Sequence, residues 1–356
     1  MKLLLPSTLL LLGISLSAQM PGMMSMQAAT ADGTSLGANH TLATDGIALG
    51  NRVKMTGFVD FIFMYDDLDG GAQTEDFSSA ADVDFLFDLS PVTAELHLNA
   101  ANSNSISATT TDNNGTGNTY STTGTADGVG IEQVFGRYSF NNSFHLTFGR
   151  QLTSLGFEAD EAPGLYATSF AYHYNGNDSA DFRRNYKDGV RLNFNNGQFG
   201  FIFGLHDGYW ANEDFNDDNI AIDLAASVMI VPGLEAQLGY AQEEVDALSD
   251  DISQFNAWIS YSPNDLTLAM EYDNFDIAAT DYWALMLLGN YQFVDWMGAT
   301  LRYSHEDYND EEADRITLAL LFTITDNLFF NVEYSTTDVD GGNDKDEFYM
   351  EGLLTF

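Results

Sequence analysis

Apolar and polar residues alternate at every second position along most of this chain. In residues 327–337, for example, Leu328 and Phe330 share one face of a strand, whereas Asn331 and Glu333 share the other. A period of two indicates strands, and alternating segments of about ten residues are typical of transmembrane β-barrels. We predict sixteen strands, at 52–65, 80–89, 92–101, 129–140, 143–151, 187–196, 198–207, 220–231, 233–243, 252–262, 265–274, 281–292, 296–306, 314–324, 327–337 and 346–356.

The connections between these segments alternate between two kinds. One kind is a tight turn built on dipeptides such as Asn196–Gly197 and Pro232–Gly233, whose residues favour turns. The other kind is long, polar and acidic. An outer-membrane barrel has short periplasmic turns at one rim and long extracellular loops at the other. We therefore expect eight outer loops, at 66–79, 102–128, 152–186, 208–219, 244–251, 275–280, 307–313 and 338–345.

A soluble β-sandwich is the alternative, since its strands also alternate. Two features favour a membrane barrel. Strands of about 11 residues, tilted by about 45°, cover roughly 25 Å, which is the height of the apolar band of such barrels. Aromatic residues also fall at segment ends on the apolar face, as interfacial girdles require. These residues are Tyr65, Phe140, Tyr240, Tyr261, Trp283, Tyr291, Trp296, Tyr303 and Tyr334. Residues 51–356 are thus predicted to form an all-β, antiparallel transmembrane barrel.

The first residues predict export. In residues 1–18, Lys2 precedes an apolar run that ends in the small residues Ser17 and Ala18, which is the pattern of a cleaved signal peptide. Residues 19–50 are rich in Gly, Ala and Met and are expected to be a flexible linker. Nothing later approaches 18 continuous apolar residues, so no transmembrane helix is expected. An exported membrane protein of this kind belongs in the bacterial outer membrane.

Composition excludes several function classes. The net charge is -41, with 53 acidic against 12 basic residues, whereas a nucleic-acid partner needs a basic surface. There is no Cys for disulfides or thiolate metal sites. The chain has no HExxH or GxSxG motif, and the Asp- and Asn-rich loops lack the full spacing of a calcium-binding loop. We therefore expect no enzyme activity, no cofactor and no metal site.

The longest aperiodic insertion runs from Thr153 to Tyr186, after the fifth segment. Acids come early in it, aromatics in the middle and two adjacent arginines late. So many aromatics argue against disorder, and loops of this length are usually functional. We expect this loop to fold into the barrel and narrow it. The predicted constriction residues are Glu158, Asp160, Glu161, Arg183, Arg184 and Lys187. Opposed acids and bases would set up a transverse field; alternatively, the arginines only pin the loop to the wall by ion pairs.

Side-chain parity also assigns the lumen wall. The inward-facing acids are Asp60, Asp82, Asp84, Asp88, Glu95, Glu132, Asp223, Glu235, Glu271, Asp273, Glu333 and Glu351, and the inward-facing bases are Arg52, Lys54, Arg137, Arg191, Arg302 and Arg315. The pore-lining candidates among them are Asp60, Asp84, Glu95, Glu132, Arg137, Arg191, Glu271, Arg302, Arg315 and Glu333. Because acids outnumber bases twofold, a weak preference for cations is expected.

Two stretches resemble known proteins. The chain ends in DEFYMEGLLTF, which resembles the C-terminal strand of Gram-negative outer-membrane proteins, where a final aromatic such as Phe356 is recognised by the barrel-assembly machinery. The pieces FGRQLTSLGFEADEAPGLYATSFAY, NYKDGVRLNF and HDGYWANEDFNDDN, between Phe148 and Asn219, resemble the OmpL-like, or porin-2, family of β-barrel porins. That resemblance implies an outer-membrane pore. In general porins the constriction loop follows the fifth strand, as the long loop does here.

The sequence therefore favours a porin that passes small hydrophilic solutes and ions by passive diffusion, since a barrel of 16–18 strands leaves an aqueous channel. The expected partners are outer-membrane lipid and lipopolysaccharide, the assembly machinery through Phe356, and the permeating solutes. Analogy with general porins suggests a homotrimer. A closed structural or adhesive barrel without conductance is the alternative, and the large loops leave it open.

Overall fold

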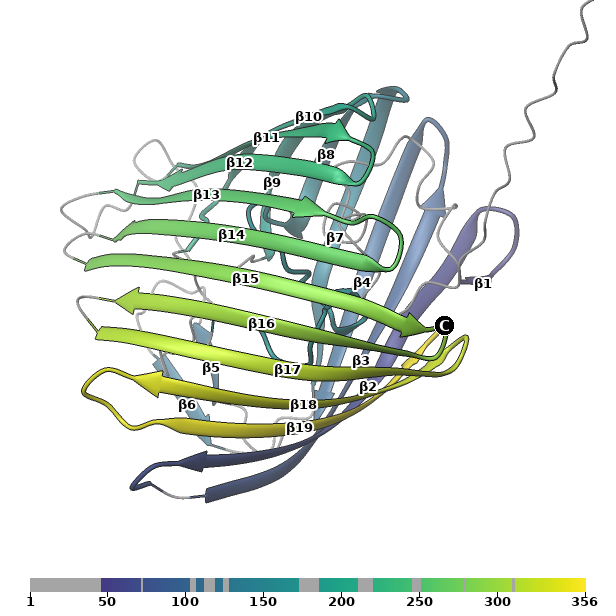
Figure 1. Ribbon diagram of the computed structural model, residues 1–356. Coiled ribbons are helices and arrows are strands. Elements are labelled where there is room, and N and C mark those ends of the chain that lie inside the picture. Colours follow the sequence, from purple (N-terminus) through teal and green to yellow (C-terminus); the bar gives the residue numbers. More distant parts are fainter. Residues whose placement is uncertain are drawn as a thin grey trace, which may run out of the picture.

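Sixteen antiparallel strands form a closed barrel in the computed structural model (Figure 1). The structure describes residues 46–71, 73–102, 107–111, 119–123, 128–172, 186–210, 220–244, 251–277, 280–308 and 311–356. The barrel strands are β2 (Val53–Leu68), β3 (Gln73–Asp88), β4 (Val92–Asn102), β7 (Gly128–Asn141), β8 (Phe144–Leu152), β9 (Tyr186–Asn195), β10 (Phe199–His206), β11 (Ala221–Val231), β12 (Leu234–Glu243), β13 (Ile252–Tyr261), β14 (Leu266–Ile277), β15 (Thr280–Val294), β16 (Met297–Tyr308), β17 (Glu311–Thr325), β18 (Leu328–Val339) and β19 (Lys345–Thr355).

Within the described residues, three short strands lie outside this ladder of sixteen. β1 (Ile47–Ala48) pairs with the start of β2. β5 (Ser107–Thr111) and β6 (Thr119–Thr123) form a separate two-stranded ribbon in the connection from β4 to β7. The signal peptide predicted at 1–18 and most of the linker predicted at 19–50 lie outside the described residues, so both stay predictions.

The barrel closes between its last and first strands. β19 pairs antiparallel with β2 from Lys345 opposite Leu68 to Thr355 opposite Phe58. The pairing continues beyond β19, because the amides of Gly57 and Phe356 donate to each other's carbonyl oxygens at 3.0 and 2.9 Å. A Cβ atom on Gly57 would lie 2.1 Å from the Asp82 carbonyl oxygen, so only glycine fits here. The seam therefore carries a continuous backbone ladder.

The two faces of the barrel differ in polarity as the alternation predicts. On β16, Leu301 is 59% exposed on the outside, whereas the neighbouring Arg302 is 0% exposed on the inside. Outward-facing apolar side chains recur on every part of the ladder, among them Leu238, Ile316 and Leu318. An apolar outer band around a polar interior is the arrangement of an outer-membrane barrel. Among the described residues, no helix is long and apolar enough to cross a membrane.

All sixteen predicted strands are confirmed, but several of the predicted outer loops are wrong. The 66–79 loop is mostly strand, because β2 continues to Leu68 and β3 begins at Gln73. Likewise, strand pairing continues into the predicted loops 275–280 and 307–313, with Ile277 opposite Thr280 and Tyr308 opposite Glu311. The ladder is held by backbone hydrogen bonds. Polar side chains above the apolar band therefore do not interrupt the ladder, although they end the alternation of apolar and polar residues in the sequence.

The closed barrel predicts that boiling changes the electrophoretic mobility of the protein. Folded protein in detergent should run at a different position on an unboiled gel from boiled protein, because a closed barrel has no free edge at which detergent can open it. Circular dichroism of the unboiled sample should show a β-type spectrum. Identical mobility of both samples together with a helical spectrum would contradict the closed barrel.

Candidate functional site

The first half of the long loop after β8 packs inside the barrel. Residues 153–172 contain one short 3-10 turn, η2 (Ala162–Gly164), and are otherwise irregular. Leu155, Phe157 and Ala171 are nearly fully buried, although the loop belongs to no strand. Its hydrogen bonds reach wall residues of β11, β14, β16, β18 and β19. The prediction of an inward-folded loop after the fifth barrel strand is confirmed for these residues.

An apolar patch on the lumen side of β13–β16 receives the loop. The ring centroid of Phe157 lies 5.7 Å from that of Trp258 in an edge-to-face contact and 6.1 Å from that of Tyr166 in a stacked one. Burying one such side chain contributes about 1.5–3 kcal/mol. The cluster comprises Phe157, Tyr166, Ala171 and Tyr172 of the loop with Trp258, Ala269, Phe275, Tyr282, Ala284, Met286 and Leu288 of the wall. The lumen wall is therefore partly apolar, and the loop covers its apolar part.

A second apolar contact holds the beginning of the loop. Leu155 is buried with Ile202 and Tyr209. A Cβ atom on Gly239 would lie 2.1 Å from Leu155 Cδ2, so the missing side chain of Gly239 lets the loop approach the backbone of β12 closely. The loop is thus packed against the wall from β10 to β16 before its polar contacts are considered.

Arg302 of β16 is the main polar anchor of the loop. Its Nη1 atom donates to Glu158 Oε1 at 2.6 Å and to the Ser169 carbonyl oxygen at 2.8 Å, and its Nη2 atom donates to the Phe170 carbonyl oxygen at 2.9 Å. The side chain is fully buried. Glu158 also accepts from the Ala171 amide at 2.8 Å. Arg302 and Glu158 therefore clamp both arms of the loop to one point on the wall.

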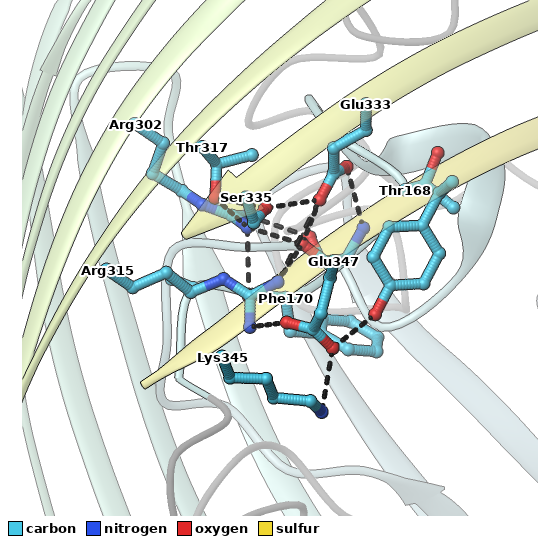
Figure 2. A network of polar contacts seen from close by, with 12 residues as sticks. Thr168, Phe170, Arg302, Arg315, Thr317, Glu333, Ser335, Lys345 and Glu347 are labelled. Atoms are coloured by element: carbon cyan, nitrogen blue, oxygen red, sulfur yellow. Dashed lines mark hydrogen bonds and ion pairs between the residues drawn. The ribbon is translucent and has the colours of Figure 1, made fainter. Parts of the chain in front are cut away.

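Figure 2 shows how the network continues onto the neighbouring strands. Arg315 of β17 lies between two carboxylates, with Nη1 2.8 Å from Glu347 Oε2 and Nη2 4.0 Å from Glu333 Oε1. Its Nη2 atom also donates to Ser169 Oγ at 3.1 Å. The Ser169 hydroxyl in turn donates to Glu333, which also accepts from the Ser169 amide at 3.0 Å. Lys345 Nζ lies 2.9 Å from Glu347 Oε1. Loop and wall thus share one charge-assisted network, whose bonds are stronger than neutral ones.

Wall carboxylates bind three other points of the loop. The Phe157 amide donates to Glu271 Oε1 at 2.6 Å, and the Ser154 hydroxyl donates to Asp223 Oδ2 at 2.5 Å. The Thr168 hydroxyl donates to Glu351 Oε2 at 2.8 Å. An irregular loop inside a barrel must find partners for its amides and hydroxyls, because leaving them unpaired would be costly. The inward-facing acids on the wall supply these partners.

Arginines at two other wall positions are held by acids of their own. Arg191 Nη2 donates to the Leu152 carbonyl oxygen at 2.7 Å and lies 3.6 Å from Asp223 Oδ2. Arg137 Nη2 lies 3.6 Å from Glu95 Oε1. Both guanidinium groups are buried. Arg191 fixes the point where β8 ends and the loop begins.

The tip acid Glu161 meets the opposite wall, at β3 and β4. Its Oε1 atom lies 4.0 Å from His97 Nδ1. Loss of hydration inside the barrel raises the pKa of Glu161 well above its usual range, although the side chain is only partly buried. The negative charges of Asp84, Glu132 and Asp160 raise this pKa further, and His97 opposes them. The acids at this point therefore crowd one another.

The predicted constriction residues thus fall into separate groups. Glu158 pairs with Arg302, whereas Glu161 and Asp160 lie in the acidic cluster beside His97. Lys187 is buried near the start of β9. Arg183 and Arg184 lie outside the described residues, so their part in a transverse field stays a prediction. Arginines do hold the loop to the wall, but they are Arg302 and Arg315 of the wall strands. Pinning of the loop by Arg183 and Arg184 also stays a prediction.

The predicted pore-lining residues face inward. Three further residues take part in the contacts between loop and wall, but they were not among the predicted site residues. Asp60 lies near Glu351, Asp84 contacts His97, and Glu132 lies near Asp82. The missed residues are Ser169, Glu347 and His97. Glu347 has the same parity as Glu351 and could have been found from it, and His97 has inward parity on β4. No sequence signal marks Ser169, because its role comes from where the loop folds.

The comparisons with known proteins bear on the fold. No protein-family model and no curated protein matches the sequence. Among solved structures, an anion-selective porin from Comamonas acidovorans matches with TM-score 0.58 at 16% identity, over 85% of this chain and 99% of that one. OprB of Pseudomonas putida matches with TM-score 0.62 at 12% identity, over 86% and 94%. The trimer form of OmpT, an outer-membrane protein of Vibrio cholerae, matches with TM-score 0.55 at 14% identity, over 86% and 100%. The chain has a porin fold.

Proposed function

We propose that this chain forms a water-filled outer-membrane channel through which small hydrophilic solutes and ions diffuse passively. The observation that carries the proposal is the charged lumen with a loop anchored inside it by Arg302, Arg315 and wall carboxylates. A polar wall lets hydrated solutes pass, and an inward loop limits their size. Passive diffusion requires no enzyme activity. The proposal does not depend on membership of the OmpL-like family, although the resemblance to that family agrees with a channel function.

The constriction is proposed to lie at the loop. Glu158, Asp160 and Glu161 contribute acids from its described half, with Lys187 at its return and with Arg183 and Arg184 before that return in the sequence. Charges near a narrow point orient hydrated ions and polar solutes more strongly than charges far from it. The Arg302–Glu158 pair neutralises one of these acids.

A weak preference for cations is part of the proposal. Twelve inward-facing acids stand against six bases on the wall strands by parity. At physiological salt the Debye length is about 8 Å, so charge on the wall of a narrow pore is felt across it. The preference should therefore increase in dilute salt.

The proposal also covers the export and the membrane surroundings of the channel. We infer that a cleaved N-terminal signal exports the chain, that the assembly machinery recognises β19 with Phe356, and that lipid and lipopolysaccharide surround the outer face. The trimer form of the OmpT structure makes a homotrimer the assembly to test first.

Planar-bilayer recording tests the channel directly. Purified barrel should insert in discrete conductance steps, and the reversal potential in a KCl gradient should have the sign of a cation-preferring pore. Heat-denatured protein at the same detergent concentration is the control. A folded protein that inserts without any step would support the closed structural or adhesive barrel instead. A chloride-selective step would leave the channel in place and contradict the argument from wall charge.

A further inference from the structure

We propose that Asp82 of β3, His97 of β4 and Glu161 of the loop bind one divalent transition-metal ion of the zinc class, which fastens the loop to the wall. Each of these residues offers a ligand atom, and the three atoms lie within 4.8 Å of one another. Asp82 and His97 are buried. No local spacing marks this site in the sequence, because its ligands come from two strands and a loop.

The carboxylate of Asp82 is the group that points most directly to a bound cation. Its side chain is 0% exposed, and neither carboxylate oxygen has a hydrogen-bond partner among the described residues. Burying an unpaired carboxylate is costly, so such groups are normally paired or coordinate a metal. Asp82 is directed toward the same small space as His97 and Glu161. A cation there would neutralise it.

The surroundings of this space are strongly acidic. Asp84 Oδ1 lies 2.8 Å from His97 Nδ1, and Asp82 lies near Asp84 and Glu132. One histidine among several carboxylates cannot balance their charge even when it is protonated. A divalent ion adds two positive charges at the point where the carboxylates converge, which bulk counterions cannot do in a buried site.

One ring nitrogen of His97 faces the position of the ion, and the other is held by the wall. Nδ1 lies 4.0 Å from Glu161 Oε1 and 2.8 Å from Asp84 Oδ1, so a bound ion would replace the Asp84 contact of His97. Its Nε2 atom lies 3.3 Å from Glu95 Oε2, and Arg137 Nη2 lies 3.6 Å from Glu95 Oε1. Metal-binding histidines almost always donate their other ring N–H to a carboxylate or carbonyl, which fixes the ring. Glu95 and Arg137 therefore act as positioning residues for His97.

The mixed ligand set favours a transition metal over calcium or magnesium. Zinc takes imidazole nitrogen and carboxylate oxygen at about 2.0–2.2 Å, whereas calcium and magnesium prefer oxygen ligands alone. With such bond lengths the ligand atoms of a tetrahedral ion stand roughly 3.3–3.6 Å apart. A ligand set spread over up to 4.8 Å must therefore contract slightly. Glu161 can supply that movement, because its side chain is 33% exposed and belongs to the loop.

Metal binding to the full-length folded barrel in detergent tests the proposal. The protein is stripped with a chelator, freed of it, and titrated with Zn²⁺, with bound metal measured by elemental analysis. One tight equivalent per chain is expected. Asp82→Asn and His97→Gln should each weaken binding by at least about tenfold, as loss of even outer-shell partners does at metal sites. Glu235→Gln, which removes an inward-facing acid on β12, is the matched control and should leave binding unchanged.

Three results would contradict the proposed metal site. The first is that the native protein binds no tight equivalent of Zn²⁺, and the second is that Asp82→Asn binds Zn²⁺ as tightly as the native barrel does. The third result is displacement of Zn²⁺ by equimolar Ca²⁺ or Mg²⁺. Glu161→Gln should also weaken Zn²⁺ binding. Because Glu161 lies outside the strands, this variant still tests the site if a wall variant fails to fold. Co²⁺ should also give the native barrel a visible absorption band that His97→Gln or Glu161→Gln weakens. Because metal content is measured without current, failure here leaves the channel function untouched.

Discussion

Deleting residues 158–182 should raise single-channel conductance severalfold while the barrel still assembles. The deleted residues belong to no described strand, and residues 158–172 occupy the lumen, where they are held by contacts to β16, β17, β18 and β19. Removing them widens the path without breaking the ladder. The measurement is a comparison of conductance steps in planar bilayers, with gel mobility as the check on assembly.

A deletion of the same length elsewhere is the control. Removing residues 103–127 also takes out 25 residues, and it removes the β5–β6 ribbon, which is not part of the barrel ladder. Its conductance should stay close to that of the intact chain. Equal steps for both deletions would mean that the 158–182 segment does not limit the current, and the constriction hypothesis would then be wrong.

Arg302→Ala should release the docked loop. The guanidinium group is fully buried and donates to Glu158 and to two loop carbonyl oxygens. Its removal leaves Glu158 as a buried charge without its arginine, and breaking a buried pair in this way costs about 3–5 kcal/mol. Amides of the loop, such as that of Ala171, should exchange hydrogen at least about a hundredfold faster, because each 1.4 kcal/mol is a factor of ten. Hydrogen exchange followed by mass spectrometry measures this directly.

Arg150→Ala is the matched control for that change. Arg150 lies on β8 and pairs with Asp188 at 3.7 Å, but the two side chains are 37% and 55% exposed. Exposed pairs contribute at most about 1 kcal/mol. Loop exchange in this variant should be almost unchanged. If Arg302→Ala behaves in the same way, the network in Figure 2 does not hold the loop.

The wall of the barrel could be predicted from the sequence because strand parity is a local property. Whether Leu301 or Arg302 faces outward is decided by the residues beside them, and the structure agrees. The strand ends at the outer rim were harder. Asp67 pairs with Gln73 in the ladder, although polar residues at both positions hide the alternation. Backbone pairing there does not depend on side-chain type.

The docking of the loop could not be predicted, because it depends on contacts between residues far apart in the sequence. Trp258 and Met286 have inward parity and break the polar pattern, which was a visible signal of something apolar inside the lumen. Nothing local shows that Phe157 covers them. Ser169 meets Glu333 across 164 positions of sequence. Its partner follows only from the closed barrel and the path of the loop.

The loop contacts also bear on the seam where the barrel closes. Thr168 binds Glu351 on β19. Ala162 packs against a cluster made by Phe58 of β2, Phe329 of β18 and Leu353 of β19. One short segment therefore touches both strands that close the ladder. Contacts of such large sequence separation form late in folding, so we expect the loop to dock after the strands have paired. The same segment that narrows the finished lumen thus braces the joint of the barrel from within.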